Sequence, residues 1–279
     1  MRSDVSELRA FYDQPLGRAA GLVLTERVRR RWPALGGMQV LGLGYAPPLL
    51  AGLGNKTAHM LAAMPAGQGA LRWPAERRCR TVLTEEDALP FPDLAFDRVL
   101  LAHDVETSDH LAGRLREIWR ILAAEGRLMI IAPNRRGLWA RFEHTPFGHG
   151  RPWSRSQLER LLREAMFEPL GSEEALFAPP LGRLVRPGAA ETWERFGRRC
   201  LPLFGGVVVA EAAKRLAGVT PLPVRSHRNL LAGVQGVLDP MPPMPQPGGA
   251  PRCGRPPSRS APPCGPAPIR NYADNRLRG

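Results

Sequence analysis

Short apolar runs alternate with helical patterns along the first 220 residues, and this alternation restricts the fold more than any other feature of the sequence. Four short runs predict strands: residues 38–43, 80–83, 96–102 and 126–132. The last of them is almost continuously apolar, as a strand buried on both faces is. Three segments repeat apolar residues at helical spacing: residues 17–32, 108–122 and 154–166. Strands that alternate with helices predict βαβ units and a doubly wound, mostly parallel α/β sheet. Ligands of such sheets bind at the carboxyl ends of the strands.

Weaker patterns complete the expected order of elements. They predict a short helix at residues 4–12, a strand at 57–62, late strands at 174–177 and 206–210, and a helix at 189–199. Ser154 is a good helix N-cap, and Gln157 completes a capping box with it. The expected domains are an N-terminal helical cap (1–37), the α/β domain (38–220), a connecting segment (221–238) and a tail (239–279).

The composition changes abruptly near Leu238. Residues 239–279 contain twelve prolines and show no apolar periodicity. Such a segment cannot bury enough surface to offset the entropy lost on ordering. We therefore expect a disordered, partly polyproline II tail, which is either a PxxP ligand or without function.

The chain is strongly basic, with a formal net charge of +13, and all but two of its 39 basic residues are arginines. The arginines are scattered, so either general base composition or phosphate recognition explains them. The four cysteines form no CxxC pair and have no histidine at metal-ligand spacing, so no metal site is expected. The sequence shows neither a signal peptide nor an 18-residue apolar run. These features predict a cytoplasmic protein without a membrane partner.

Two stretches carry the most informative motifs. An apolar strand runs into Gly42-Leu43-Gly44, where glycine allows a tight turn or the close approach of a ligand. About 45 residues later, residues 85–100 read EEDALPFPDLAFDRVL. This text resembles the middle of class I methyltransferases of the type 11 group. The resemblance extends to Glu106 and to the segments IWRIL at 118–122 and EGRL at 125–128.

The resemblance spans residues 38–133 and implies a seven-stranded, Rossmann-like methyltransferase fold that binds S-adenosylmethionine. Carried over by position, seven residues are implied to line the cofactor site: Gly42, Gly44, Tyr45, Met64, Glu85, Leu89 and His103. Among them, the glycines would approach the amino-acid part of the cofactor and Glu85 the adenine amino group.

Two departures from the family pattern affect the expected cofactor site. Gly42 stands where the family has an acidic residue, and only Gly44 of the three motif glycines is clearly retained. The acid that normally ends the second strand is replaced by Ala62-Ala63-Met64-Pro65. The sequence therefore leaves open weaker cofactor binding, an altered pose or a lost activity.

The loop after the strand at 126–132 should cover the same edge of the sheet. It offers an anionic or aromatic substrate five candidate residues: Asn134, Arg135, Arg136, His144 and His149. The alternative is a structural loop whose arginines pair with nearby acids. Methyl transfer mainly requires alignment of the reacting atoms, so the sequence identifies no catalytic residue.

The favoured hypothesis is an S-adenosylmethionine-dependent methyltransferase acting on a small-molecule acceptor. A non-catalytic binding or scaffold protein with the same fold is the alternative, motivated by the altered glycine motif. A nucleic-acid methyltransferase is less favoured, because Ala102-His103-Asp104-Val105 replaces the expected catalytic text after the fourth strand. No protein partner can be inferred.

Overall fold

The computed structural model describes residues 3–54, 59–181, 189–201 and 203–214. The chain divides into two units, Met1–Thr220 and Pro221–Gly279, and every described residue belongs to the first. The expected connecting segment and tail therefore lie outside the described residues, as does the start of the strand expected at 57–62.

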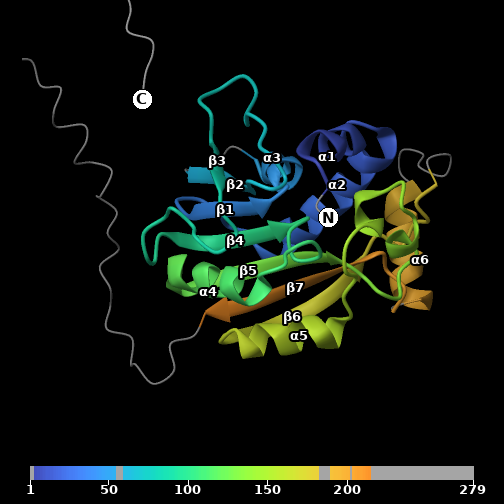
Figure 1. Ribbon diagram of the computed structural model, residues 1–279. Helices are drawn as coiled ribbons and strands as arrows, with labels where there is room; N and C mark the ends of the chain where they lie inside the picture. The colour runs from blue at the N-terminus through green and yellow to red at the C-terminus, as the bar shows by residue number, and fades with distance from the viewer. Residues whose placement is uncertain (1–2, 55–58, 182–188, 202, 215–279) are drawn as a thin grey trace, which may run out of the picture. The chain divides into compact units, whose positions relative to one another are not determined.

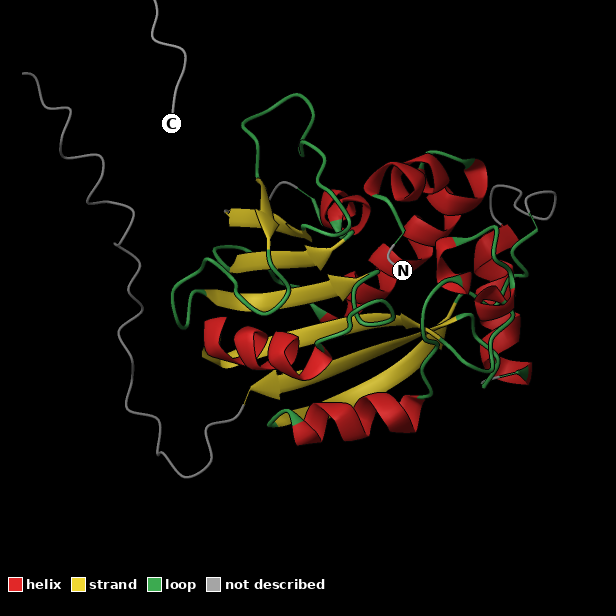
Figure 2. Ribbon diagram, viewed as in Figure 1, coloured by secondary structure: helices red, strands yellow, loops and turns green. Residues whose placement is uncertain are grey.

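The first unit is built on a seven-stranded sheet with the order β3-β2-β1-β4-β5-β7-β6 (Figures 1 and 2). The strands are β1 (Gln39–Gly44), β2 (His59–Pro65), β3 (Thr81–Thr84), β4 (Phe96–Ala102), β5 (Leu122–Pro133), β6 (Phe167–Ala175) and β7 (Val207–Lys214). Strand β7 alone is antiparallel to its neighbours. The prediction of a seven-stranded, mostly parallel, doubly wound sheet is confirmed.

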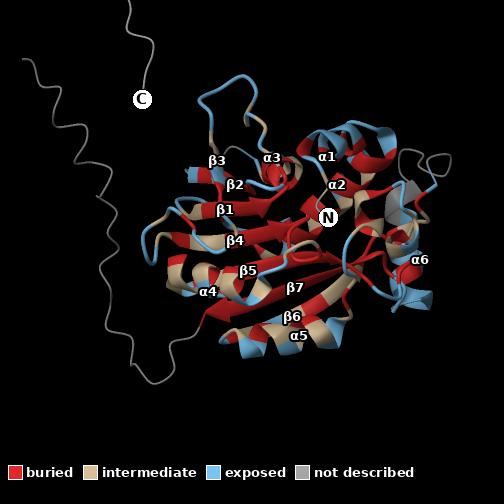
Figure 3. Ribbon diagram, viewed as in Figure 1, coloured by how far each residue is buried: buried red, intermediate tan, exposed pale blue. Residues whose placement is uncertain are grey.

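Two apolar cores lie on opposite faces of the sheet, because successive strand residues point to opposite sides. Val40 and Leu100 belong to one core, and their neighbours Leu41 and Val99 belong to the other. The first core is covered by α1 (Val5–Tyr12), α2 (Pro15–Arg31) and α3 (Pro47–Gly52). The second is covered by α4 (Leu111–Ile121) and α5 (Arg155–Glu164). The buried strands appear as continuous red ribbons between these helices in Figure 3.

Most expected elements are present, including the capping box of Ser154 and Gln157 at the start of α5 and a late helix, α6 (Ala189–Cys200). Several boundaries were wrong, most of all in four strands. Strand β6 begins at Phe167 rather than at 174, β5 begins at Leu122 rather than at 126, β2 extends to Pro65 rather than to 62, and β7 extends to Lys214 rather than to 210. Strand β6 lacks an apolar run because it pairs only with β7 and bends between Pro169 and Gly171.

Within the described part of the chain, no helix is both long and apolar enough to cross a membrane.

Candidate functional site

The strand order reverses between β1 and β4, and ligand sites of open α/β sheets lie at this switch point. Gly44 ends β1 with a φ of +74°, and a Cβ atom there would lie 2.3 Å from the carbonyl oxygen of Ala102. The next residue, Tyr45, donates its backbone N–H to that same oxygen at 2.8 Å. Glycine at position 44 is therefore required by the close contact of β1 with the end of β4.

Gly42 is also closely surrounded by the protein itself. A Cβ atom at this position would lie 2.6 Å from Cβ of Ala46 and 2.8 Å from Cδ1 of Leu50. Both contacts come from the α3 region, which follows the glycine motif directly. The two motif glycines thus serve the packing of the strand ends.

Helix α1 lies over the end of β4 and contacts His103. The Tyr12 hydroxyl is 2.8 Å from Nε2 of His103, and both residues are buried. The imidazole also packs against the ring of Phe147, with centroids 4.7 Å apart. His103 itself has a φ of +53°, an uncommon backbone conformation for a residue with a side chain. A residue from the chain start therefore completes the surroundings of a residue after β4.

The second ring nitrogen of His103 faces an acid. Its Nδ1 atom lies 3.4 Å from Oε1 of Glu106, which is also buried. Burial, followed by the charges of Tyr45 and Glu106, raises the pKa of Tyr12, so its phenol remains protonated. From these charges we assign the Tyr12 hydroxyl as donor to Nε2, with the imidazole proton on Nδ1 toward Glu106.

Tyr45 belongs to the same aromatic group. Its ring centroid lies 5.8 Å from that of Tyr12. Burial, followed by the charge of Asp13, raises the pKa of Tyr45 to about 12. Both phenols therefore stay neutral at physiological pH.

A small hollow of about 10 Å³, roughly the space of one water molecule, lies beside His103. It is lined by Ser3, Leu8, Gln68, His103, Glu106, Thr107 and Pro146. Two of its buried oxygens, Oε1 of Gln68 and Oε2 of Glu106, have no hydrogen-bond partner. Buried polar atoms normally have partners, so these two acceptors are available for hydrogen bonds from a bound water or a ligand.

A third unpaired buried oxygen, Oγ1 of Thr84, lies at the carboxyl end of β3. The carboxyl ends of parallel strands meet at one edge of a sheet. Strands β2, β3 and β4 therefore each lead into an unpaired oxygen at this edge: Gln68 after β2, Thr84 on β3 and Glu106 after β4.

A buried ion pair braces the loops around this edge. Arg114 of α4 contacts both carboxylate oxygens of Asp104, at 3.1 and 3.3 Å, and both side chains are fully buried. The same guanidinium donates to the backbone oxygens of Glu85 and Glu86. Arg114 therefore fixes the segment after β3 relative to the segment after β4, whereas the Glu85 side chain is exposed.

The segment that carries the LPFPD text is held by α4. Arg120 donates to the backbone oxygens of Leu89 and Phe91, and Glu117 accepts the N–H of Leu89 at 3.1 Å. Leu89 is buried in the second core. Met64, near the end of β2, is buried in the first core. Met64 also accepts a hydrogen bond from the N–H of Leu71 through its sulfur.

Comparison with known families identifies part of the chain. Residues 30–130 match the model of a methyltransferase domain family. This part of the chain is therefore similar to a methyltransferase domain. No curated protein matches it in sequence.

Solved methyltransferase structures share the fold of this domain. A Thermotoga maritima S-adenosylmethionine-dependent methyltransferase, described as a possible histamine N-methyltransferase, is 19% identical with a TM-score of 0.53. The match covers 76% of this chain and 96% of that one. A structure of the complex between the Haloferax volcanii Trm112 methyltransferase activator and a protein described as a methyltransferase gives 18% identity and a TM-score of 0.55, covering 76% and 95%.

The loop after β5 gives three of its candidate substrate residues, Asn134, His144 and His149, different hydrogen-bond partners. Asn134 is buried, and its side-chain amide donates to the backbone oxygen of Gly205 at 2.8 Å. His144 lies 3.0 Å from the oxygen of Pro180 through Nε2. His149 joins the Ser3 hydroxyl to the backbone oxygen of Glu143. Arg135 and Arg136 are exposed.

The structure therefore brings Tyr45 and His103 together at the carboxyl edge of the sheet, close to residues that the sequence did not single out. Tyr12, Gln68 and Thr84 are the main additions. Gln68 could have been predicted as a site residue, because it is a polar residue that follows an apolar strand closely. Tyr12 offered no such signal, because its partner lies 91 positions away.

Proposed function

We propose that this protein is an S-adenosylmethionine-dependent methyltransferase that acts on a small-molecule acceptor. The observation that carries the proposal is the pair of unpaired buried oxygens, on Gln68 and Glu106, that line the hollow at the switch point of a methyltransferase fold. Unsatisfied acceptors of this kind suit a ligand rich in hydroxyl and amino groups.

The residues present fit such a cofactor. Gln68 follows β2, where the family has the acid that binds the ribose hydroxyls, and its amide can take over that role. Thr84 ends β3 and would hold the adenine amino group in place of the exposed Glu85. Glycines 42 and 44 shape the floor of the site through the strand packing described above.

The chemistry of the bound cofactor is the supply of an activated methyl group on its sulfonium sulfur. The chain's own residues exclude water and orient the acceptor. Leu8 of α1 lines the hollow and Tyr12 bonds to His103 beside it, which limits the access of water. His103 is the side chain placed to accept a proton at Nε2 from an acceptor that replaces the Tyr12 hydroxyl, and Glu106 would then stabilise the imidazolium from the Nδ1 side.

The size of the hollow predicts that α1 moves. Ligand sites for molecules of this class usually enclose about 300–1,000 Å³, far more than the hollow of about 10 Å³ beside His103. Three hydrogen bonds hold this N-terminal segment in place: Tyr12 to His103, Val5 N–H to the oxygen of Gln68, and Ser3 to His149. Breaking these bonds would enlarge the site without disturbing the sheet.

The acceptor class rests on the enclosed setting of His103. A site covered by α1 suits a small molecule better than a duplex or a protein surface. The Haloferax volcanii complex contains a methyltransferase activator, so a protein partner is compatible with the fold. The cytoplasm remains our proposed location.

A non-catalytic binding protein is the second candidate. The contacts of Ala46 and Leu50 with Gly42 favour it, because they occupy space beside a glycine that would otherwise accommodate the cofactor.

Calorimetric titration of the full chain with S-adenosylmethionine and with its demethylated product distinguishes the two candidates. We expect micromolar binding, weakened at least tenfold (about 1.4 kcal/mol) by Gln68→Leu. Gln39→Leu is the matched control, because Gln39 starts β1 at the opposite edge of the sheet. No binding at millimolar cofactor, in a chain shown to be folded by circular dichroism, would overturn the enzyme proposal in favour of the binding protein.

A further inference from the structure

Four large apolar side chains are exposed within nine residues at the end of α6 and in the turn that follows it. Their exposed fractions are 53% for Phe196, 49% for Leu201, 50% for Leu203 and 53% for Phe204. We call these four residues the apolar patch. Single exposed apolar residues are ordinary, but a local group of this size usually marks an interaction surface.

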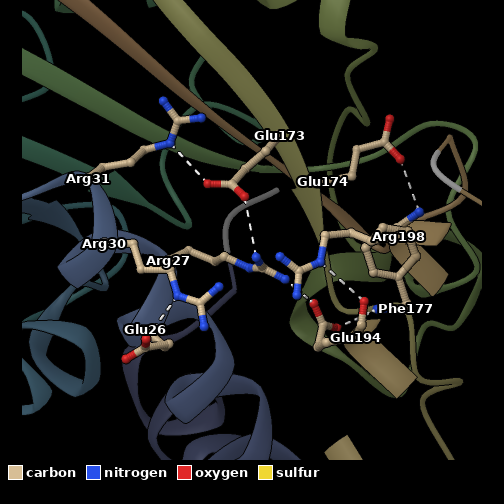
Figure 4. Close-up of polar contacts among 10 residues, drawn as sticks. Glu26, Arg27, Arg30, Arg31, Glu173, Glu174, Phe177, Glu194 and Arg198 are labelled. Atoms are coloured by element: carbon tan, nitrogen blue, oxygen red, sulfur yellow. Dashed lines mark hydrogen bonds and ion pairs between the residues drawn. The ribbon is translucent and has the colours of Figure 1, made fainter. Parts of the chain in front are cut away.

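The orientation of α6 is fixed by its buried side. Glu194 lies 2.6 Å from Nη2 of the buried Arg27 of α2, and it also accepts the backbone N–H of Phe177 at 2.8 Å (Figure 4). One turn later, Gly197 packs so closely that a Cβ atom would lie 2.3 Å from Phe177. Phe196 therefore faces outward because inverting the helix would break a buried ion pair.

The turn after α6 is held equally firmly. The N–H of Leu201 donates to Gly197, and the N–H of Phe204 donates to Leu201. Gly205 then accepts from the side chain of Asn134 and donates its own N–H to Glu174. The apolar patch therefore lies at the end of α6 and on a hydrogen-bonded turn, which together hold its side chains at the surface.

The charge around the patch is positive. Arg195, Arg198 and Arg199 are exposed on α6, and none of them takes part in an ion pair within the described residues. The adjoining loop after β5 adds the exposed Arg135 and Arg136. Glu174 is the acid at this end of β6, and it already bonds to the backbone of Gly205.

We propose that this surface binds to an anionic lipid membrane. Exposed phenylalanine and leucine side chains beside arginines are the combination that amphipathic helices use to lie in a lipid headgroup region, where the arginines meet anionic headgroups. The chain's own residues 239–279 carry six arginines and two acids, so their charge does not complement the patch. Single-stranded nucleic acid stacks on aromatic side chains, which Leu201 and Leu203 do not provide.

The position of the surface relates membrane binding to the proposed methyl transfer. Gly206, which follows the patch, bonds to the backbone of Asn134 at the carboxyl end of β5. The patch therefore lies at the same sheet edge as the candidate cofactor site. An acceptor dissolved in the bilayer would meet the protein at this edge, a step that rests on the proposed function.

Vesicle flotation of the full chain tests the surface directly. We expect it to bind vesicles of phosphatidylcholine and phosphatidylglycerol in equal parts and to bind pure phosphatidylcholine at least tenfold more weakly. Phe196→Ser/Phe204→Ser and, separately, Arg195→Gln/Arg199→Gln should each lower anionic-vesicle binding at least tenfold. The matched controls, Leu22→Ser/Met166→Ser and Arg160→Gln/Arg163→Gln, alter side chains that are exposed on other elements and should leave binding unchanged.

Three results would overturn the proposal: no vesicle binding by the unaltered chain, full binding by Phe196→Ser/Phe204→Ser, or equal losses in the controls. Binding to single-stranded RNA that depends on the arginines while the phenylalanine variant binds vesicles normally would assign the surface to nucleic acid instead. Cofactor titration of each variant separates this proposal from the enzymatic one, because Phe196→Ser/Phe204→Ser should bind S-adenosylmethionine as the unaltered chain does.

Discussion

The Tyr12 hydroxyl lies 2.8 Å from Nε2 of His103, and this contact joins the first helix of the chain to the end of β4. Both side chains are buried, and the pair lies next to the hollow with the unpaired oxygens of Gln68 and Glu106. The contact thus holds α1, which covers the candidate site, against the end of β4.

Tyr12→Phe should lower the free energy of unfolding by about 1–3 kcal/mol, because it leaves the buried Nε2 of His103 without a donor. Urea denaturation followed by circular dichroism measures this loss. Tyr45→Phe is the control, since the Tyr45 hydroxyl makes no hydrogen bond within the described residues. Equal losses in the two variants would show that the Tyr12–His103 bond contributes nothing particular.

Gly44→Ala should be far more destabilising than Gly37→Ala. Both glycines have a positive φ, +74° and +77°, so alanine is strained at both positions by about 1–2 kcal/mol. Only at Gly44 would the new Cβ also collide with backbone, the oxygen of Ala102, whereas the space around Gly37 is open. Thermal unfolding of both variants without any ligand tests this, and a similar stability of the two would refute the packing explanation of the glycine motif.

The Glu117 carboxylate should contribute a pH-dependent part of the stability. Its hydrogen bonds to Arg120, helped by the N–H of Leu89, lower the pKa of Glu117 below its ordinary value. A carboxyl with a lowered pKa in the folded state stabilises the fold above its unfolded pKa of about 4.3 and loses this contribution as the pH falls through the folded value.

Glu117→Gln should therefore be less stable than the unaltered chain at pH 7, and the difference should shrink toward pH 3. Urea denaturation at pH 7, 5 and 3 measures it, with Glu125→Gln, which changes an exposed acid, as the control. A difference that stays constant with pH would show that the charge of Glu117 is not the cause.

The sequence predicts β1 and β4 well because most of their residues are buried and apolar. Strand β4 at Phe96–Ala102 has the expected bounds, and β1 and β3 differ by one residue at each end. Most of strand β6 was not predicted, because a strand at the edge of a sheet needs fewer apolar residues. Helix α3 was not predicted, because a segment of six residues that begins with two prolines is too short to show a helical repeat of apolar residues.

The candidate site was predictable only in part. The resemblance correctly directs attention to the ends of β1 and β4, where Tyr45 and His103 lie together. The contributions of Tyr12 and Gln68 depend on how α1 folds back over the sheet, and no local pattern reports such a contact. The polar residues of the loop after β5 have mainly backbone partners, which their residue types alone did not reveal.

Two paired arginines of α2 have a consequence for the order of synthesis. Arg27, which is buried, pairs with Glu194 and Glu173, and the partly exposed Arg31 pairs with Glu173 and Glu211, so their partners emerge from the ribosome at least 142 residues later. Until then, the Arg27 guanidinium must remain in water, because burying it unpaired is costly. A nascent chain that ends near residue 130, where the matched family segment stops, therefore cannot close α2 onto the sheet. Completion of the fold waits for its last strand.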